Sequence, residues 1–443
     1  MVQALTFLIG LLSGFEIPLM VRIAEDKLGE ENDNEYQIFG INYIGTLVGT
    51  TFFAYLLLPK LDVIKTSVAV ALLNLAVCIY FIVRYLKVSK KVYYAFSCAI
   101  LVLGILISSS EHKITQTYLK IFYYMPKILG ESKQEVENLY HKLDRLPEVE
   151  RSKSLYQYLD IFSYPFVYNG EVKDSTILTL DTNFQFNTAT EFLYHQAFAH
   201  VSIAVNKKVP KKVLLLGGGD GLLLRELLKY DEIESIDFIE LDEKMLDLAK
   251  GRFAELNQHS VSNPKVKVHI NDGFYFLRNT NEKFDAIFID FPYPNSYDLA
   301  RLYSVEFYTY VRKALNPDGF AILDAPFFDK ENEIKDNIRG RVMVTTIFNE
   351  RNLLNNSVLA STFYYAGFKT FFPYRIADES FLFVKQDAGA IDYDFMEKSD
   401  LSRLSKETII EMNNIKNQNF PYEISLKHIN SIFKPAVVKR NEF

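Results

Sequence analysis

A cluster of four glycines directly after an apolar run constrains the fold more than any other feature of the chain. The segment VLLLGGGDGLLLREL, residues 213–227, reads as a buried strand, a glycine loop and the start of a helix. Strand-like and helix-like segments then alternate as far as residue 324, and GFKTFFPY and ESFLFVK provide two closing strands. Such alternation predicts an α/β domain in which helices cover both faces of a parallel sheet. We expect this domain to occupy residues 206–390.

The glycine loop also indicates the class of ligand. Backbone without Cβ atoms lets a ligand approach closely, and the following helix offers free N–H groups. Gly217, Gly219 and Gly221 form G-x-G-x-G, whereas the dinucleotide fingerprint needs a glycine at the place of Leu222. The loop therefore favours an adenosyl ligand of the methionine-derived kind over NAD, and a Rossmann-like sheet of the methyltransferase type.

Acidic residues end three of the expected strands. Glu240 follows the glycine loop by about 20 residues, where an acid accepts hydrogen bonds from ribose hydroxyls. Asp272 ends the next strand and could hold an adenine amino group. Asp290 ends a buried strand in IFIDFPYPNS, which is a typical place for an active-site carboxylate. Each acid alone could be a helix N-cap, but together they indicate a site at the carboxyl edge of the sheet.

Asp220, inside the glycine loop, narrows the ligand further. A carboxylate there would repel the carboxylate of S-adenosylmethionine and attract a lone ammonium. We therefore expect the decarboxylated form, which carries an aminopropyl group, as the co-substrate.

The N-terminal part predicts a membrane region. Four apolar runs, at 4–24, 38–58, 63–83 and 92–108, approach the length of about 20 residues that a spanning helix needs. A transmembrane helical region of about four spans over residues 1–110 would contact lipid. Glu16, inside the first run, should face a helix partner or a wet cavity, unless Pro18 breaks the helix and leaves Glu16 near an interface.

Composition and charge set the remaining expectations. The net charge of −6 argues against nucleic-acid binding, and the two cysteines, Cys78 and Cys98, lie in apolar runs that do not indicate a metal site. The basic loop PKLDVIK favours a cytoplasmic catalytic domain, although the basic RYLKVSKK conflicts with a four-span topology. Three further regions are expected: a helical linker at 111–152, a small antiparallel β unit plus helix at 153–205, and a polar C-terminal helical segment at 391–443.

The ordered motifs resemble those of the spermidine synthases, the polyamine aminopropyltransferases. The motifs that carry the resemblance are YQ at 156–157, LDTNFQF, EFLYHQ, GGGDG, FIELD, NDG and FIDFPYPN. The apolar runs resemble those of bacterial members with an N-terminal transmembrane region, which implies a multi-pass protein of the bacterial inner membrane with its catalytic domain in the cytoplasm. The resemblance also implies a possible homo-oligomer.

The resemblance implies transfer of an aminopropyl group from decarboxylated S-adenosylmethionine to putrescine or another amine, without a metal. Asp290 would be the general base, and Tyr194 and His195 would line the junction with the amine. The residues implied in binding the co-substrate are Gln157, Gln185, Gly217, Gly219, Asp220, Gly221, Glu240 and Asp272.

Two departures from the family pattern concern the acceptor side. Tyr293 stands where the family loop has a second acid, and Gln196 stands where the family has a glutamate. Both remove negative charge from the region expected to bind a diamine, so Tyr293 is a candidate determinant of acceptor choice; Asp298 is a candidate replacement acid. Two alternatives remain open: an S-adenosylmethionine-dependent methyltransferase, and a non-catalytic membrane module that binds a polyamine or nucleoside.

Overall fold

The computed structural model divides the chain into two compact units, Met1–Glu148 and Val149–Phe443. The structure describes the following residues: 7, 11, 14–23, 34–57, 63–85, 90–128, 143–168, 171–292, 294, 296–325, 333–338, 341–346, 350–376, 379–387 and 422–436.

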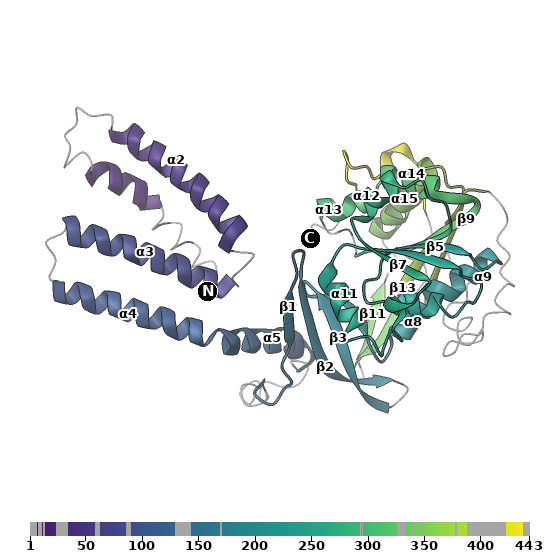
Figure 1. Cartoon of the computed structure of the whole chain (residues 1–443), viewed down its shortest axis with the longest axis horizontal. Helices are drawn as coiled ribbons and strands as arrows, with labels where there is room; N and C mark the ends of the chain where they lie inside the picture. Colours follow the sequence, from purple (N-terminus) through teal and green to yellow (C-terminus); the bar gives the residue numbers. More distant parts are fainter. Residues whose placement is uncertain are drawn as a thin grey trace. The chain divides into compact units, whose positions relative to one another are not determined.

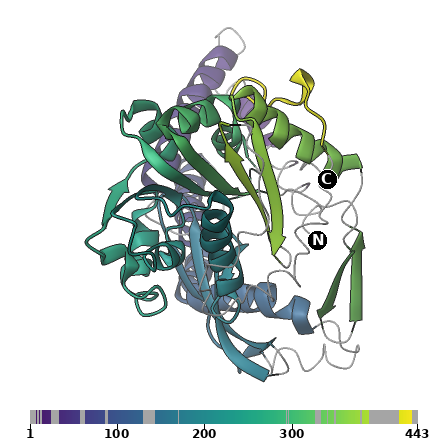
Figure 2. The same ribbon diagram turned by 90° about the vertical axis from the view of Figure 1, so that its right-hand side faces the viewer.

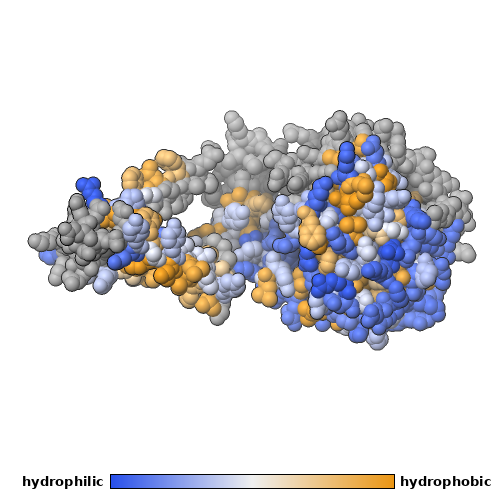
Figure 3. All heavy atoms as spheres, turned by 90° about the horizontal axis from the view of Figure 1, so that it is seen from above, coloured by the Kyte–Doolittle hydropathy of each residue, from blue (hydrophilic) through white to orange (hydrophobic). Residues whose placement is uncertain are grey.

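The described part of the first unit is helical (Figure 1). Its elements after residues 14–23 are α2 (Asn34–Phe52), the π-helical turn η1 (Phe53–Leu57), α3 (Val63–Tyr85), α4 (Lys90–Ser109) and α5 (Glu111–Ile128). Apolar side chains lie on the outside of these helices, and Leu47 in α2 is 71% exposed (Figure 3). A surface of this kind is typical of an interaction with lipid or another protein.

The expected spans are supported only in part. Among the described residues, Tyr36–Leu57 is one helix long and apolar enough to cross a bilayer, and Ser97–Ser109 with Glu111–Tyr124 would form a second if this pair, bent by 55°, is taken as one span. The runs at 63–83 and 92–108 fall on α3 and α4. Residues 14–23 are helical through Pro18, so the break considered there does not occur. The four-span region stays a prediction.

The second unit begins with a four-stranded antiparallel sheet, as predicted, although it starts three residues earlier than expected. Its strands, in spatial order, are β1 (Glu150–Lys153), β2 (Tyr158–Tyr168), β3 (Glu171–Leu180) and β4 (Asn183–Asn187). One face carries Leu159, Leu178 and Phe186, which form a buried cluster with Met245 and Phe253. This cluster attaches the small sheet to the α/β part of the unit.

The helix predicted after the small sheet contains a π-helical turn. It runs through α8 (Glu191–Gln196), η2 (Ala197–Val201) and α9 (Ser202–Asn206). Single π turns inside helices occur often at functional sites. Here the π turn directly follows Tyr194 and His195, two of the predicted site residues.

The α/β part has the predicted fold: a mostly parallel seven-stranded sheet (Figures 1 and 2). The strands, in spatial order, are β12 (Thr370–Ile376), β13 (Glu379–Lys385), β9 (Leu315–Asp324), β8 (Phe284–Asp290), β5 (Lys212–Gly217), β6 (Ser235–Glu240) and β7 (Val266–Ile270). The strands from β9 to β7 are parallel, and β13 is antiparallel to both of its neighbours. The helices are α10 (Leu222–Leu227), α11 (Glu243–Lys250), α12 (Gly273–Asn279), α13 (Tyr297–Ala300), α14 (Val305–Ala314) and α15 (Glu350–Tyr365).

The strand order positions the site. The chain starts the sheet at β5 in the middle, builds β6 and β7 on one side, and then returns to place β8 on the other. Ligands of open α/β sheets bind where the strand order reverses in this way, beyond the carboxyl ends of the strands. The glycine loop after β5 and Asp290 at the end of β8 lie at this point.

Several elements differ from the sequence prediction. The helix α11 ends at Lys250, and turns follow it; the helix α15 and a hairpin of β10 (Glu333–Ile338) with β11 (Arg341–Thr346) were not predicted. Residues 391–421 of the expected C-terminal helical segment lie outside the described residues. Residues 422–436, expected to be part of a polar helical segment, instead have only a short 3-10 turn, Leu426–His428, and their Asn430 is fully buried.

Candidate active site

The glycine loop packs directly on Asp290. Gly217 pairs with Asp290 across the two parallel strands, and Gly217 and Gly218 have φ angles of +78° and +72°. A Cβ on Gly217 would lie 2.1 Å from the Asp290 carbonyl oxygen, and one on Gly218 would lie 2.9 Å from the Asp290 carboxylate. Glycine is therefore required both by the left-handed backbone and by the space that the aspartate occupies.

Gly219 makes the equivalent approach to Glu240. A Cβ there would lie 2.6 Å from Oε2 of Glu240. The other carboxylate oxygen of Glu240 accepts a hydrogen bond from the Asp242 amide at 2.8 Å, and the Gln157 side-chain amide donates to the Asp242 carboxylate at 3.0 Å. Burial, with the nearby negative charges of Asp242 and Asp220, raises the pKa of Glu240 to about 7. The structure thus places Gly219 against Glu240, and Gln157 is connected to Glu240 through Asp242.

Asp220 occupies the start of α10. Its Oδ1 accepts a hydrogen bond from the Leu222 amide at 2.8 Å, and burial raises its pKa. The backbone of the loop is fixed from outside, because Asn257 donates to the Asp220 carbonyl at 2.8 Å and Ser260 to the Gly221 carbonyl at 2.6 Å. Asn257 and Ser260 lie more than thirty residues from the loop, and sequence reasoning missed both of them.

Asp290 and Tyr194 form the centre of the site. The Tyr194 hydroxyl donates a hydrogen bond to Asp290 Oδ1 at 2.7 Å. Burial and the negative charge of Asp220 raise the pKa of Asp290 to about 6, whereas the Tyr194 hydrogen bond and the His195 charge act in the opposite direction. A carboxylate with this pKa is mostly ionised at pH 7 and still accepts a proton readily, which is the property required of a general base.

Two further acids, which sequence reasoning missed, lie on the same face of the sheet as Asp290. Phe288, Ile322 and Phe381 belong to one buried cluster, together with Phe198 of η2. Asp290, Asp324 and Glu379 each stand two positions from one of these residues in β8, β9 and β13, and side chains two apart in a strand share a face. Like the acids that were predicted, Asp324 ends a strand, AILD, so the same signal could have found it.

Asp324, Glu379 and Asp290 affect the pKa of Tyr194, and they affect one another. The pKa of Asp324 is raised well above its usual value by burial and by the charges of Glu379 and Asp290, and a hydrogen bond with Tyr194 opposes the rise. Burial and the same three carboxylates raise the pKa of Tyr194. The site therefore places three carboxyl groups near the tyrosine hydroxyl, and burial together with their mutual repulsion favours the protonated form of Asp324.

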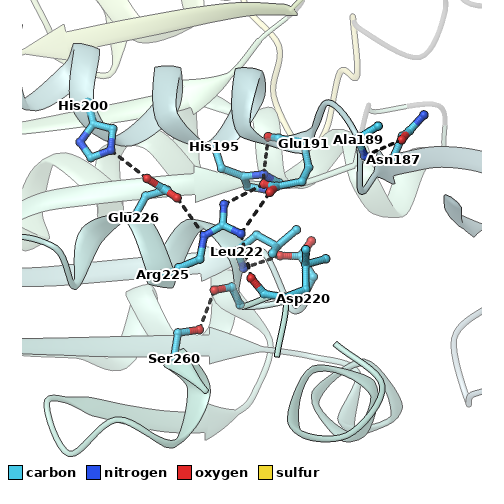
Figure 4. Close-up of polar contacts among 12 residues, drawn as sticks. Asn187, Ala189, Glu191, His195, His200, Asp220, Leu222, Arg225, Glu226 and Ser260 are labelled. Carbon is cyan, nitrogen blue, oxygen red and sulfur yellow. Dashed lines mark hydrogen bonds and ion pairs between the residues drawn. The ribbon is translucent and has the colours of Figure 1, made fainter. Parts of the chain in front are cut away.

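A buried network of charged side chains fixes His195 (Figure 4). The His195 Nδ1 lies 3.0 Å from Glu191 Oε2, and Arg225 donates to both oxygens of that carboxylate at 3.1 and 2.8 Å. Arg225 also contacts Glu226 Oε1 at 2.8 Å, and Oε2 of Glu226 lies 2.9 Å from Nε2 of His200. Burial alone would lower the pKa of His195, but the Glu191 hydrogen bond and the surrounding acids raise it.

Among the described residues, Gln185 and Asp272 make no hydrogen bond or ion pair with this assembly, and the position of a third predicted residue is not described. Gln185 makes only local contacts, from its amide to the carbonyls of Asn183 and Phe184 at 3.4 and 3.2 Å. Asp272 caps α12 by accepting from the Tyr275 amide at 2.8 Å, and its other oxygen pairs with Arg301 at 2.5 Å. Tyr293 lies outside the described residues.

Two further residues were predicted on the acceptor side, Gln196 and Asp298. Gln196 is buried in α8. Asp298 is exposed on α13, and the charges that act on Asp290 come from Asp220 and His195. Its role as a replacement acid stays a prediction. Within the described ranges, no group of three or more His, Cys, Asp or Glu side chains is arranged to hold a metal ion.

Comparisons with known proteins agree with the motifs. Residues 191–351 match the family model of the spermine/spermidine synthase domain. The polyamine aminopropyltransferase of Oceanobacillus iheyensis is 31% identical over 334 residues, which are 74% of this chain and 59% of the relative. The polyamine aminopropyltransferase of Leptospira interrogans is 31% identical over 319 residues, 70% of this chain and 57% of the relative.

A solved structure of a spermidine synthase in complex with the transition state analogue AdoDATO is also similar. It is 24% identical, with a TM-score of 0.47, and covers 60% of this chain and 84% of its own. The chain spans less than two thirds of the length of the curated relatives named above. The match over residues 191–351 supports the family that the motifs indicate for that part of the chain.

Proposed function

We propose that the chain transfers an aminopropyl group from decarboxylated S-adenosylmethionine to an amine. The observation that carries this proposal is the position of Asp290, beside the glycine loop and 2.7 Å from Tyr194, with a pKa raised to about 6. The acceptor nitrogen would attack the aminopropyl carbon bonded to the sulfonium. The carbon–sulfur bond breaks, the sulfur keeps the electron pair, and Asp290 takes the proton that the nitrogen loses.

The residues of the loop fit the proposed donor. Glu240 lies against Gly219, in the place of an acid that binds ribose hydroxyls, and Asp220 places a carboxylate at the start of α10. A carboxylate there attracts the ammonium of the aminopropyl group, whereas the additional carboxylate of intact S-adenosylmethionine would be repelled. Asp272 would contact the adenine only with the oxygen atoms that its α12 cap and Arg301 leave accessible.

Titration calorimetry tests the identity of the donor. We expect the full chain to bind decarboxylated S-adenosylmethionine at least about tenfold more tightly than the intact compound, which corresponds to about 1.4 kcal/mol. Asp220→Asn should reduce this preference, because it removes the charge that discriminates between the two. Tighter binding of the intact compound by the unmodified chain would instead favour a methyltransferase.

The acceptor is proposed to be a diamine or polyamine. The lost acids at positions 196 and 293 are offset by Asp324 and Glu379, which lie on the same face as Asp290 and bring carboxyl groups to the acceptor side. A bound ammonium would favour the ionised form of Asp324, so binding of the amine should release a proton. The attacking amine would then lie at Asp290, with a second ammonium beside Asp324.

Asp324→Asn tests this arrangement. We expect the KM for a diamine to rise about tenfold, in line with the loss of a charge-assisted hydrogen bond, while the KM for a monoamine of equal chain length changes little. Asp318→Asn is the matched control, since Asp318 lies exposed at the other end of β9. An unchanged ratio of diamine to monoamine use in Asp324→Asn would refute a second ammonium site there.

We also propose that the first unit anchors the chain in a bacterial inner membrane and that the catalytic unit lies in the cytoplasm. The apolar helix Tyr36–Leu57 and the exposed apolar side chains of α3 and α4 support an anchor. The full chain should remain with membranes washed in alkaline carbonate, and recovery in the wash would contradict the anchor.

We further propose that the chain is able to form homo-oligomers, which light scattering of the detergent-solubilised chain would test.

A further inference from the structure

Residues 422–436 form a strap, a C-terminal segment with little regular structure that is held against α15 and α14. Three hydroxyls on α15 accept hydrogen bonds from backbone amides of the strap: Ser357 from Glu423 at 2.8 Å, Ser361 from Ser425 at 3.0 Å, and Thr362 from Asn430 at 2.9 Å. Backbone amides need such partners when they leave water. Figure 2 shows the strap, in yellow, beside α15. The strap is thus fixed along its length by side chains of the catalytic unit.

Asn430 connects the strap to the segment between α13 and α14, which lies next to the active site. Its side chain is 0% exposed, and its Nδ2 donates to the carbonyls of Ala300 and Tyr303, both at 2.9 Å. Its own carbonyl accepts from the Val305 amide at 2.9 Å. These bonds hold the turn between α13 and α14, which is the 3-10 segment Arg301–Tyr303.

The same turn contacts the loop after Asp290 and also Asp272, the acid that follows β7. The Tyr303 hydroxyl lies 3.3 Å from the Phe291 carbonyl and 3.2 Å from the Pro292 carbonyl, the first two carbonyls after Asp290. Arg301 pairs with Asp272 at 2.5 Å. One contact therefore fixes the loop that leaves the catalytic strand, and the other fixes an acid at the end of β7.

The position of this loop affects both sides of the site. A Cβ on Gly217 would lie 3.1 Å from Cδ1 of Phe291, and one on Gly273 would lie 3.0 Å from Cζ of the same ring. Phe291 thus fills the space between the glycine loop and the start of α12. A shift of the backbone after Asp290 would move this ring and change the alignment of the carboxylate.

We propose that Asn430 is a positioning residue of the active site, which acts through the turn Arg301–Tyr303 to hold the loop after Asp290. The C-terminal strap, in which the sequence shows no chemistry, then contributes to catalysis without touching substrate. The effect on turnover rests on the proposed aminopropyl transfer, whereas the effect on the loop itself does not.

The test compares Asn430→Ala with Ser431→Ala in the full chain. Ser431 is the next residue of the strap, and its hydroxyl donates to Glu306 at 2.8 Å rather than to the turn. Because a misplacement of about 1 Å at a reacting group can cost about a hundredfold in rate, we expect Asn430→Ala to lower kcat for methylthioadenosine release by about tenfold to a hundredfold. We expect Ser431→Ala to remain within about twofold of the unmodified chain. Equal losses in the two variants would overturn the proposal.

Tyr303→Phe tests the same link without altering the strap. It removes only the hydroxyl that contacts the two loop carbonyls, so kcat should fall while the KM for the amine changes little. The double variant with Asn430→Ala should lose no more than Asn430→Ala alone, because both changes break one chain of contacts. An unmodified kcat in Tyr303→Phe would overturn the proposal, even if Asn430→Ala failed to fold.

Hydrogen exchange separates this inference from the proposed function. If the unmodified chain releases no methylthioadenosine with any amine, the proposed function fails. The positioning role of Asn430 is then tested by hydrogen exchange alone. Amides of residues 296–304 should exchange faster in Asn430→Ala than in Ser431→Ala. Equal exchange rates of these amides in the two variants would contradict the positioning role of Asn430, whether or not the chain is active.

Discussion

Asp290→Asn should lower kcat for aminopropyl transfer by about 10²- to 10⁴-fold, the usual contribution of a general base. The amide keeps the size of the side chain and its contact with Tyr194 but does not take a proton from the attacking amine. Binding of the donor, measured by calorimetry, should remain. Asp318→Asn provides the control, since Asp318 is exposed at the end of β9 opposite Asp324 and should keep the kcat of the unmodified chain.

The dependence of the rate on pH gives a second readout of the same carboxylate. Asp290 must be ionised to act, and its pKa is about 6, so kcat/KM should fall about tenfold per pH unit below pH 6. Tyr194→Phe removes a hydrogen bond that lowers this pKa, and so the acidic limb should move to higher pH. If Asp290→Asn keeps the kcat of the unmodified chain, another group must take the proton. If the unmodified chain binds its ligands but shows no turnover, the non-catalytic alternative is favoured.

Arg225→Met should destabilise the fold by about 3–5 kcal/mol, because it leaves two buried carboxylates without their shared cation. Arg225 is 8% exposed, and it holds Glu191 through two hydrogen bonds and Glu226 through one. Arg225→Lys should recover only part of the loss, since an ammonium does not reproduce the bidentate contact. Urea denaturation of the full chain in detergent, followed by circular dichroism, gives the change.

The control and the pH dependence follow from the same charges. Lys211→Met removes an exposed pair with Glu234 and should leave the midpoint of denaturation near that of the unmodified chain. The pKa of Glu226 is lowered to about 2 against an opposing effect of burial, so its contribution to stability is present above the unfolded value near 4.5 and is lost as the pH falls towards 2. A denaturation midpoint in Arg225→Met equal to that of Lys211→Met would show that the network does not stabilise the fold.

The central part of the parallel sheet was predictable because several of its strands are mainly apolar and end in a glycine or an acid. The glycine cluster marks the end of β5, and acids mark the ends of β6 and β8. The acid at the end of β9, Asp324, carries the same signature, and only its place in the strand order shows that it faces the same side as Asp290. Strand order and register are long-range properties that a single segment of sequence does not encode.

The supporting contacts were less predictable than the site itself. Asn430 lies about 130 residues from Ala300, and a polar residue in a polar segment gives no sign that it will be buried. Glu191 and Arg225 belong to short helices in which charged residues are usually exposed, yet the structure pairs them inside the unit. Gln185 illustrates the opposite case, because the motif assigns it a ligand role while the structure gives it only local contacts.

The most direct test of the central claim is a measurement of methylthioadenosine released by the purified full chain from decarboxylated S-adenosylmethionine in the presence of a panel of amines. We predict one methylthioadenosine for each aminopropylated amine formed, with diamines or polyamines used best. Intact S-adenosylmethionine should give no methylated amine. Bound donor with no methylthioadenosine from any amine would contradict the proposed function.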